Sequence, residues 1–443
     1  MRIVAIILAA CTLLATHDAR AERYAYVLND GNNTLSAIDV DTAMVVATIP
    51  LPGGPRAVAV HPDGRTVYVV ATTNSELAVI DVPAHTERMR FQLPNVFDPG
   101  DLAVDPAGDF LYIADRFSRF VAQLPTLTLD TNDIEYIDIG FTGAERIAVD
   151  PAGDRVYVVT GSDGRLLWFD VDASGTASTV TEHATRFNGP RDLSVSWSHT
   201  PLVTRQSGAA TNTLYSVSTS SATGTVLPIT STGEPTGIAV YDSFGFPQIF
   251  VTRKANDQLV NPLSGETHAT QDQPVAATYS DDEEDTADGE ALITANFGAG
   301  SATLVYGDGR VVHVPTAPEP IDVAAGAVLR PRFQWSPVRV DFLYELFKVT
   351  QLKRIKLWNG GSGRLRLGRP VIEGADAARF AVSKNGCPAT LMPGASCFID
   401  VAFTPLPGPK DVKWPEFAAT LQLSSNDAAT PQARIALTGK HGR

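Results

Sequence analysis

The sequence of 443 residues has only three cysteines, four methionines and 19% charged residues. It contains no C-x-x-C pair, so it lacks the common zinc, thioredoxin-type and c-type haem motifs. No G-x-S-x-G, H-E-x-x-H or phosphate-binding glycine motif is present, and the histidines are scattered. The sequence therefore predicts no metal site and no cofactor, and it favours a non-catalytic protein. Glycine and proline are plentiful instead, at 35 and 30 residues, which indicates a folded chain with many turns.

The first 21 residues have the pattern of a signal peptide. A basic start precedes the thirteen-residue apolar run Ile3–Ala15, and Ala19-Arg20-Ala21 matches the small-x-small site of signal peptidase. That run is shorter than the ~20 residues of a membrane-spanning helix, and no later run is long enough. We expect residues 1–21 to be removed and the protein to be periplasmic, secreted or on the cell surface. The alternative is lipidation of Cys11, because residues 8–11 resemble a lipoprotein processing box.

Removal of the leader leaves two cysteines, Cys387 and Cys397, in a compartment where thiols tend to pair. The sequence therefore predicts a disulfide between them. Closing so short a loop contributes about 2–3 kcal/mol of stability in the chain-entropy model.

A six-residue segment, here called the anchor, recurs seven times and usually starts with proline. The anchors begin 44, 45, 46, 45, 39 and 46 residues apart, which is the period of four-stranded propeller blades. They are Pro55–Val60, Pro99–Val104, Ala144–Val149, Pro190–Val195, Pro235–Val240, Pro274–Tyr279 and Pro320–Ala325.

Turns and strands between the anchors support this reading. The tetrapeptides His61–Gly64, Asp105–Gly108 and Asp150–Gly153 each carry proline at the second turn position and glycine at the end, as tight hairpins do. The chain begins with the second strand of a blade, Tyr24–Leu28, and the seventh anchor is an inner strand with no blade after it. Pairing these two segments would close a ring and remove free edges. The sequence thus predicts a seven-bladed propeller over residues 22–328.

The stretch Tyr26–Gly64 resembles the YVTN propeller repeat of exported bacterial and archaeal proteins. It contains Tyr26-Val-Leu-Asn29 and Thr34-Leu-Ser-Ala-Ile-Asp39, and the match is strong in blades one to four and fades in five to seven. The resemblance implies a periplasmic or cell-surface propeller. Some relatives bind nucleic acid or other ligands, and related seven-bladed propellers include lactonases, so the resemblance implies a fold more than a function.

Residues 329–443 lack the repeat and have short alternating strands, the pattern of a small β-sandwich. Motifs such as Trp358-Asn-Gly-Gly361 and Leu437-Thr-Gly439 make this segment similar to immunoglobulin-like domains of the choice-of-anchor D (ASH/HYDIN-like) type. In that family two cysteines bracket an L-x-P-G-x-S-C turn, as Cys387 and Cys397 do. The resemblance implies a non-catalytic adhesion or assembly module. The predicted fold class is all-β, a seven-bladed propeller followed by an immunoglobulin-like sandwich.

Charge is divided unevenly between the two predicted domains. Residues 22–328 hold 16 Lys and Arg against 40 Asp and Glu, a net charge of −24, whereas residues 329–443 hold 17 against 8, a net charge of +9. The sandwich either rests on the propeller or presents a basic face to an anionic partner, such as an envelope polymer, lipid headgroups or nucleic acid. The predicted face carries Lys348, Lys353, Arg354, Lys356, Arg364, Arg366 and Arg369.

Propellers generally bind ligands at a mouth of the central channel, where the starts of the inner strands meet. The two residues after each anchor start should line that mouth. Its charged members are Arg56, Asp101, Glu145, Arg146, Arg191, Asp192 and Asp322. Arginine forks there suit a carboxylate or phosphate, although neighbouring arginines and acids also pair with each other. Adjacent loops add Arg116, Arg119, Arg205, Arg253 and Lys254, together with acids.

These observations favour an exported binding or assembly protein of the bacterial envelope or exterior. Its mouth would bind an unknown ligand or an envelope protein, and its sandwich would anchor or dock it. One alternative is a lactonase-type hydrolase that uses Glu145 or Asp101 with Arg146. Another is binding of single-stranded nucleic acid, which the charge of −24 on residues 22–328 disfavours.

Overall fold

The computed structural model describes residues 22–443 except for a set of short gaps. The gaps are residues 173, 197, 206–212, 231–232, 244–245, 281–289, 329–331, 346–349, 362, 364, 392–394, 405–415, 428–429 and 442–443. The expected signal peptide, the Cys11 alternative, Lys348 and Arg364 lie outside the described residues. None of the helical segments that are described has the length and apolar character needed to cross a membrane.

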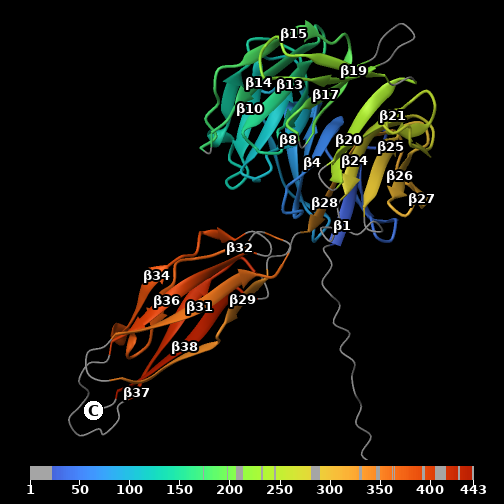
Figure 1. The fold of residues 1–443 in the computed structure, drawn as a ribbon. Coiled ribbons are helices and arrows are strands. Elements are labelled where there is room, and N and C mark those ends of the chain that lie inside the picture. The colour runs from blue at the N-terminus through green and yellow to red at the C-terminus, as the bar shows by residue number, and fades with distance from the viewer. Residues whose placement is uncertain are drawn as a thin grey trace, which may run out of the picture.

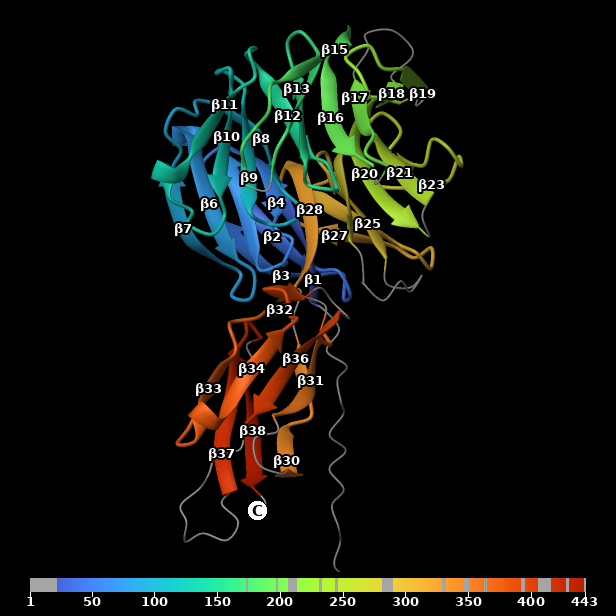
Figure 2. The same cartoon turned by 60° about the vertical axis from the view of Figure 1, so that its left-hand side comes forward.

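The described part of residues 22–328 forms seven four-stranded antiparallel sheets around a common centre (Figures 1 and 2). The first sheet consists of β28 (Pro320–Val328), β1 (Glu22–Asn29), β2 (Thr34–Asp39) and β3 (Met44–Pro50). The next two are β4 (Pro55–Val60), β5 (Thr66–Ala71), β6 (Glu76–Asp81) and β7 (Thr86–Gln92), then β8 (Pro99–Val104), β9 (Phe110–Asp115), β10 (Phe120–Pro125) and β11 (Glu135–Asp138).

The remaining four sheets follow in chain order. Two of them are β12 (Ala144–Val149), β13 (Arg155–Thr160), β14 (Arg165–Asp170) and β15 (Thr181–Arg186), then β16 (Pro190–Val195), β17 (Pro201–Arg205), β18 (Thr213–Val217) and β19 (Val226–Thr230). The last two are β20 (Pro235–Ser243), β21 (Phe246–Arg253), β22 (Gln258–Val260) and β23 (Thr267–Ala269), then β24 (Pro274–Ser280), β25 (Ala291–Asn296), β26 (Ser301–Tyr306) and β27 (Val311–Pro315). Short 3₁₀ turns lie at η1 (Thr73–Ser75) and η2 (Thr131–Asp133).

The ring is closed by the pairing of its two ends. Strand β1 runs antiparallel to β28, with Tyr26 opposite Ala324, so the predicted pairing of the first and last segments is confirmed. The inner strands β28, β4, β8, β12, β16, β20 and β24 each contact the inner strand of the sheet before and the sheet after. This radial packing of sheets is that of a β-propeller.

The predicted hairpin turns lie where the sequence places them. Gly64, Gly108 and Gly153 have φ values of 68°, 76° and 80°, which glycine adopts without steric cost. Each donates its N–H to the carbonyl of the residue three positions earlier, at 2.8 Å. These turns join the inner strand of a sheet to its second strand. The second strands then bury tyrosines between neighbouring sheets, with Tyr26 and Tyr112 both 1% exposed.

The described part of residues 333–441 forms a separate unit of two facing four-stranded sheets, here called the two-sheet unit (Figure 2). One apolar core, which includes Phe342, Ile355, Phe403 and Leu437, receives side chains from both sheets. The first sheet is β29 (Phe333–Ser336), β31 (Gln351–Asn359), β36 (Ser396–Phe403) and β34 (Phe380–Asn385). The second is β30 (Arg339–Glu345), β38 (Gln432–His441), β37 (Glu416–Ser424) and β33 (Val371–Glu373). A small pair, β32 (Leu365–Arg366) and β35 (Thr390–Leu391), and the turn η3 (Ala377–Arg379) complete the described elements.

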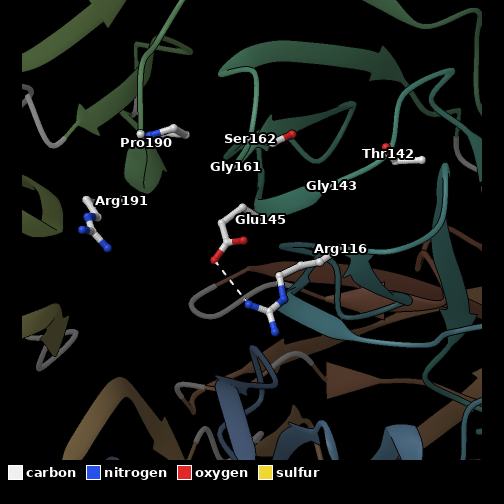
Figure 3. A pocket seen from close by; sticks show the side chains of 9 residues that line it. Arg116, Thr142, Gly143, Glu145, Gly161, Ser162, Pro190 and Arg191 are labelled. Atoms are coloured by element: carbon white, nitrogen blue, oxygen red, sulfur yellow. Dashed lines mark ion pairs between the residues drawn. The ribbon is translucent and has the colours of Figure 1, made fainter.

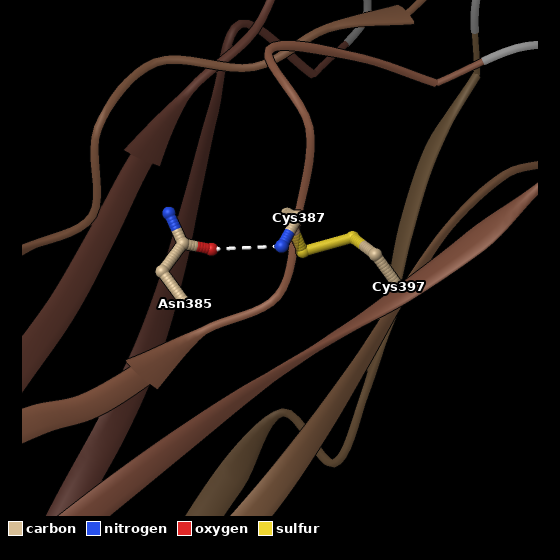
Figure 4. Close-up of a disulfide and its surroundings, with 3 residues drawn as sticks. All are labelled: Asn385, Cys387 and Cys397. Carbon is tan, nitrogen blue, oxygen red and sulfur yellow. Dashed lines mark hydrogen bonds between the residues drawn. A yellow bond between two sulfur atoms is a disulfide. The ribbon is translucent and has the colours of Figure 1, made fainter.

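The predicted disulfide is confirmed, because Cys387 and Cys397 are joined (Figure 4). The bond links β36 to the loop after β34, and the Cys387 N–H donates to the Asn385 side-chain oxygen at 3.0 Å. Cys397 is 5% exposed and belongs to the core of the two-sheet unit. The disulfide therefore ties an edge loop to a central strand.

Removal of this disulfide is expected to destabilise the two-sheet unit and to spare the ring of sheets. The double variant Cys387→Ser, Cys397→Ser should lose about 2–3 kcal/mol of the unit's unfolding free energy, because the unfolded chain gains loop freedom. Scanning calorimetry would show the transition of the two-sheet unit shifted to lower temperature and the propeller transition unchanged. Equal shifts of both transitions, or no shift, would contradict this assignment.

Candidate functional site

Each inner strand of the propeller starts with a β-bulge. One extra residue lies within the first four positions of the strand, where the register with the second strand shifts. Such a residue makes no ladder pair, and the bulge re-aims its side chain. The bulge residues in ring order are Arg56, Gly100, Glu145, Arg191, Thr236 with Gly237, Val275 and Ile321. The predicted mouth is therefore a ring of bulges.

Three aspartates next to bulge residues bond neighbouring sheets together. Asp322 accepts the N–H of Val323 in its own strand and that of Val58 in β4, both at 2.9 Å. Asp101 accepts the N–H groups of Leu102 and Ile147, at 2.9 and 3.1 Å, and so links β8 to β12.

Asp192 does the same between β16 and β20, with Leu193 and Ile238 at 2.9 and 2.7 Å. Both oxygens of each of the three carboxylates are thus engaged by backbone donors. These residues, predicted as ligand contacts, hold the ring together.

Arg146 is the cation that faces these three aspartates. Its Nε donates to the Arg191 carbonyl at 2.9 Å and its Nη1 to the Glu145 carbonyl at 3.0 Å, which fixes the guanidinium. Burial alone would lower the pKa of Arg146, but Asp101, Asp192, Glu145 and Asp322 outweigh it and raise that pKa. Arg146 is therefore a structural counter-charge for the acids.

One arginine does not balance three carboxylates. Burial raises the pKa of both Asp192 and Asp322 to about 7, and Arg146 and backbone N–H donors only partly oppose it. Burial also raises the pKa of Asp101. Repulsion from Asp101 adds to the shift at the other two. Protonation at near-neutral pH is how a crowded set of acids lowers its electrostatic cost.

Glu145 differs from the three aspartates, because three guanidinium groups surround its single carboxylate. Its Oε1 is 2.8 Å from Arg56 Nη2, 3.8 Å from Arg146 and 4.0 Å from Arg116. Arg116 also bonds Asp98 at 2.7 Å. Burial, followed by repulsion from Arg146 and Arg116, lowers the pKa of Arg56 despite its bond to Glu145. Positive charge is in excess around this carboxylate.

Arg191 and Lys254 add two cations that have no ion-pair partner in the described part of the chain. Among the described residues, neither the Arg191 guanidinium nor the Lys254 ammonium has a hydrogen-bond or ion-pair partner, and Lys254 lies 5.7 Å from the centre of the Phe297 ring. Arg191 is exposed. Figure 3 shows Arg191, Glu145 and Arg116 projecting into one pocket.

Three adjoining cavities occupy this end of the ring. The largest, about 630 Å³, is lined by Arg116, Glu145, Ser162 and Arg191 together with glycine backbone. A second, about 230 Å³, contains the three aspartates and Arg146. The third, about 280 Å³, is lined by both charged and apolar residues. Its lining includes Arg56, Arg146, Arg191, Glu234, Lys254, Val275, Phe297 and Ile321.

The structure brings the seven predicted mouth residues together. Six of them line the 230 Å³ cavity, and the seventh, Glu145, lines the 630 Å³ one. Val275 and Ile321 occupy the same anchor position as Arg56 and Arg191, so the rule that the two residues after each anchor start line the mouth includes them. The predicted site consisted of the charged members alone. Phe297 lies in the loop after β25, and sequence reasoning missed it.

The predicted basic face of residues 329–443 is less coherent. On β31, Arg354 and Lys356 alternate with the buried Ile355 and Leu357, whereas Lys353 belongs to the opposite set of positions. Arg354 makes two bonds to Asp400, at 2.7 and 3.0 Å. Arg366 belongs to the separate pair β32–β35, and Arg369 follows it. The five described residues of this set therefore do not share one sheet face, because strand alternation separates them.

No group of three or more His, Cys, Asp or Glu side chains in the described part of the chain is arranged to hold a metal ion. The carboxylates of Asp101, Asp192 and Asp322 already accept backbone N–H groups with both oxygens.

The raised pKa values give the propeller an expected pH dependence. A carboxyl whose folded pKa exceeds its unfolded value of about 3.9 stabilises the fold at low pH, and this stability is lost as pH rises through the folded pKa. The unfolding temperature of the propeller should thus fall as the pH rises from 5.5 to 8.5, with most of the fall below pH 7 and little change above pH 8.

The unfolding temperature of the double variant Asp192→Asn, Asp322→Asn should fall less over the same pH range, because the variant lacks the two titrating carboxyl groups. Calorimetry at matched ionic strength measures both slopes. An equal fall in the variant would assign the effect to histidines such as His61, and a flat wild-type curve would mean that both carboxyls stay ionised.

Comparisons with known proteins agree on the propeller. Residues 5–96 match the family model described as YNCE-like beta-propeller. A curated relative, the uncharacterized protein YwhL of Bacillus subtilis (strain 168), is 27% identical over 171 residues, which are 39% of this chain and 36% of that protein. The chain thus matches only about a third of the length of that relative.

Solved structures are similar in fold at low identity. A functionally unknown protein from Desulfotomaculum acetoxidans DSM 771 has a TM-score of 0.55 at 16% identity, over 68% of this chain and 98% of that one. Kuenenia stuttgartiensis hydrazine synthase has a TM-score of 0.51 at 16% identity, over 66% of this chain and 92% of that one. Apo AztD from Citrobacter koseri has a TM-score of 0.51 at 10% identity, over 69% of this chain and 98% of that one. Together with the family match, these similarities show that the chain contains a β-propeller in an all-β fold.

Proposed function

We propose that this chain is an exported, non-catalytic binding protein of the bacterial envelope or exterior, in which the propeller mouth binds an anionic ligand. The observation that carries the proposal is the pair of cations, Arg191 and Lys254, that face cavities at the mouth without a described partner of their own. Cations left unpaired beside concave pockets are suited to a carboxylate or phosphate from outside the protein.

The proposal includes the finer architecture. We interpret the seven sheets as seven blades of a YVTN-type propeller over residues 22–328, with β28 completing the blade that β1 begins. The disulfide and the two facing sheets support an immunoglobulin-like sandwich of the choice-of-anchor D type over residues 329–443. Such a sandwich would anchor or dock the propeller, with a signal peptide at residues 1–21 directing export.

The contacts at the mouth favour binding over hydrolysis. A lactonase would need a carboxylate able to exchange protons with substrate, and the sequence offers Asp101 and Glu145 for this role. Asp101 accepts two backbone N–H groups, and Glu145 bonds Arg56 at 2.8 Å with two further guanidiniums near it. Both carboxylates serve the local structure.

The charge contrast between the two parts of the chain supports a role for the sandwich in assembly. Its net charge of +9 suits an anionic surface or partner, and the −24 of residues 22–328 makes nucleic acid an improbable ligand for the mouth. Arg354 and Lys356 lie beside Phe398 and Trp358, at 5.4 and 5.5 Å from the ring centres, so cations and aromatics alternate on that sheet face.

The Arg191→Gln variant tests the proposed function. Phosphate, acetate and citrate are titrated into the mature protein with labelled isoleucine and valine methyl groups, and the methyl signals of Ile321 and Val275 report on the mouth. At least one anion should shift these signals, and Arg191→Gln should weaken its binding about tenfold, the equivalent of a charge-assisted hydrogen bond.

The matched control is Arg88→Gln, which removes an exposed arginine from β7, on the outer strand of its sheet. Arg88 lines none of the three cavities, so its loss should leave anion binding unchanged. If no anion moves the two methyl signals, or if both variants behave alike, the mouth is not an anion site.

A further inference from the structure

The ring of bulge residues is divided into a charged part and an apolar part. Arg56, Glu145 and Arg191 occupy this position in β4, β12 and β16. Val275 and Ile321 occupy it in β24 and β28, which are adjacent in the ring. Because β28 also contacts β4, Ile321 lies in the strand next to that of Arg56. The apolar part is thus bordered by an arginine on one side.

The 280 Å³ cavity joins the two parts. Arg56, Arg191 and Lys254 line it together with Val275, Ile321 and Phe297. Val275 and Ile321 are only half-buried, so apolar surface remains open to the cavity. Phe297, in the loop after β25, adds an aromatic wall, and Lys254 lies against its ring. Cations and apolar groups converge on one small space, which is the arrangement of sites for amphipathic ligands.

Two acids that line these cavities limit the negative charge that the space accepts. Glu234 lines the same cavity, and Glu145 lines the neighbouring one. The acid-rich 230 Å³ cavity adjoins it, because both are lined by Arg56, Arg191, Val275 and Ile321. A ligand with several negative groups would bring one of them close to these carboxylates, whereas a single anionic head could contact Arg191, Lys254 and Arg56 without doing so.

We infer that the mouth selects a small monocarboxylate with an apolar or aromatic body. The carboxylate lies between Arg191, Lys254 and Arg56, and the body packs on Val275, Ile321 and Phe297. This inference rests on the proposed anion site and adds the class of ligand that the site prefers. Burial of the body supplies affinity, and the cations fix its orientation.

Binding of benzoate, acetate and benzamide to the mature protein separates the contribution of the carboxylate from that of the apolar body. Benzoate and acetate carry the same head, and benzoate and benzamide carry the same ring. Benzoate should bind about fivefold or more tighter than acetate, since a buried ring face removes several tens of Å² of apolar surface from water. Benzamide should bind far more weakly than benzoate. Dissociation constants come from the shifts of the Ile321 and Val275 methyl signals.

The Val275→Thr variant tests the apolar part with little change in volume. It should lower the benzoate-to-acetate affinity ratio about twofold or more while acetate binding stays as in the wild type, because Ile321 and Phe297 still contact the ring. The ratio is then read from the Ile321 methyl signal alone. The control Val46→Thr, at a β3 position that is 46% exposed, should leave the ratio unchanged.

The possible outcomes distinguish this inference from the function on which it rests. Equal binding of benzoate and acetate in the wild type, or an unchanged ratio in Val275→Thr, overturns the preference for an apolar body but leaves an anion site. Equal binding of benzoate and benzamide overturns the role of the carboxylate. If none of the anions binds, both the ligand class and the proposed function are wrong.

Discussion

Pairing between β1 and β28 is the interaction on which the propeller depends. The first described strand of the chain and an inner strand about three hundred residues later form one sheet, with Tyr26 opposite Ala324. Without that ladder, β1 and β28 would each expose an unpaired edge, and the inner strands could not contact each other around a complete circle. The mouth exists only in the closed ring, because its bulge residues come from all seven inner strands.

Closure brings the starts of seven inner strands close together, and that crowding explains the chemistry of the mouth. Backbone N–H groups freed by the bulges need acceptors. Asp101, Asp192 and Asp322 supply them across three of the junctions between sheets. The same aspartates then lie near one another with Arg146 as the facing cation, so burial and mutual repulsion raise the pKa of two of them to about 7. Their protonation is a consequence of holding the ring together.

The repeat in the sequence predicted the inner strands and their turns well, because turn chemistry and strand alternation are local. The anchors became β4, β8, β12, β16, β20, β24 and β28, and pairing across the ends was inferred from the missing half-blade. Roles at the mouth were harder to predict. Asp322 and Arg56 both follow anchor starts, yet one bonds backbone and the other faces a carboxylate. That difference depends on the bulge, which shifts side-chain direction by one residue and leaves no clear trace in the sequence.

The bulge also separates structural from binding duties between adjacent residues. In β16, Asp192 joins two sheets through its carboxylate, and the preceding Arg191 has no ladder partner and extends into the cavities. In β28, Asp322 and Ile321 show the same division. A change of side chain at Arg191 or Ile321 therefore alters the mouth without removing a bond between sheets. Arg56, Arg191, Val275 and Ile321 are such residues, and Lys254 and Phe297 join them from the loops after β21 and β25. One ring can therefore present both a cationic and an apolar surface to one ligand.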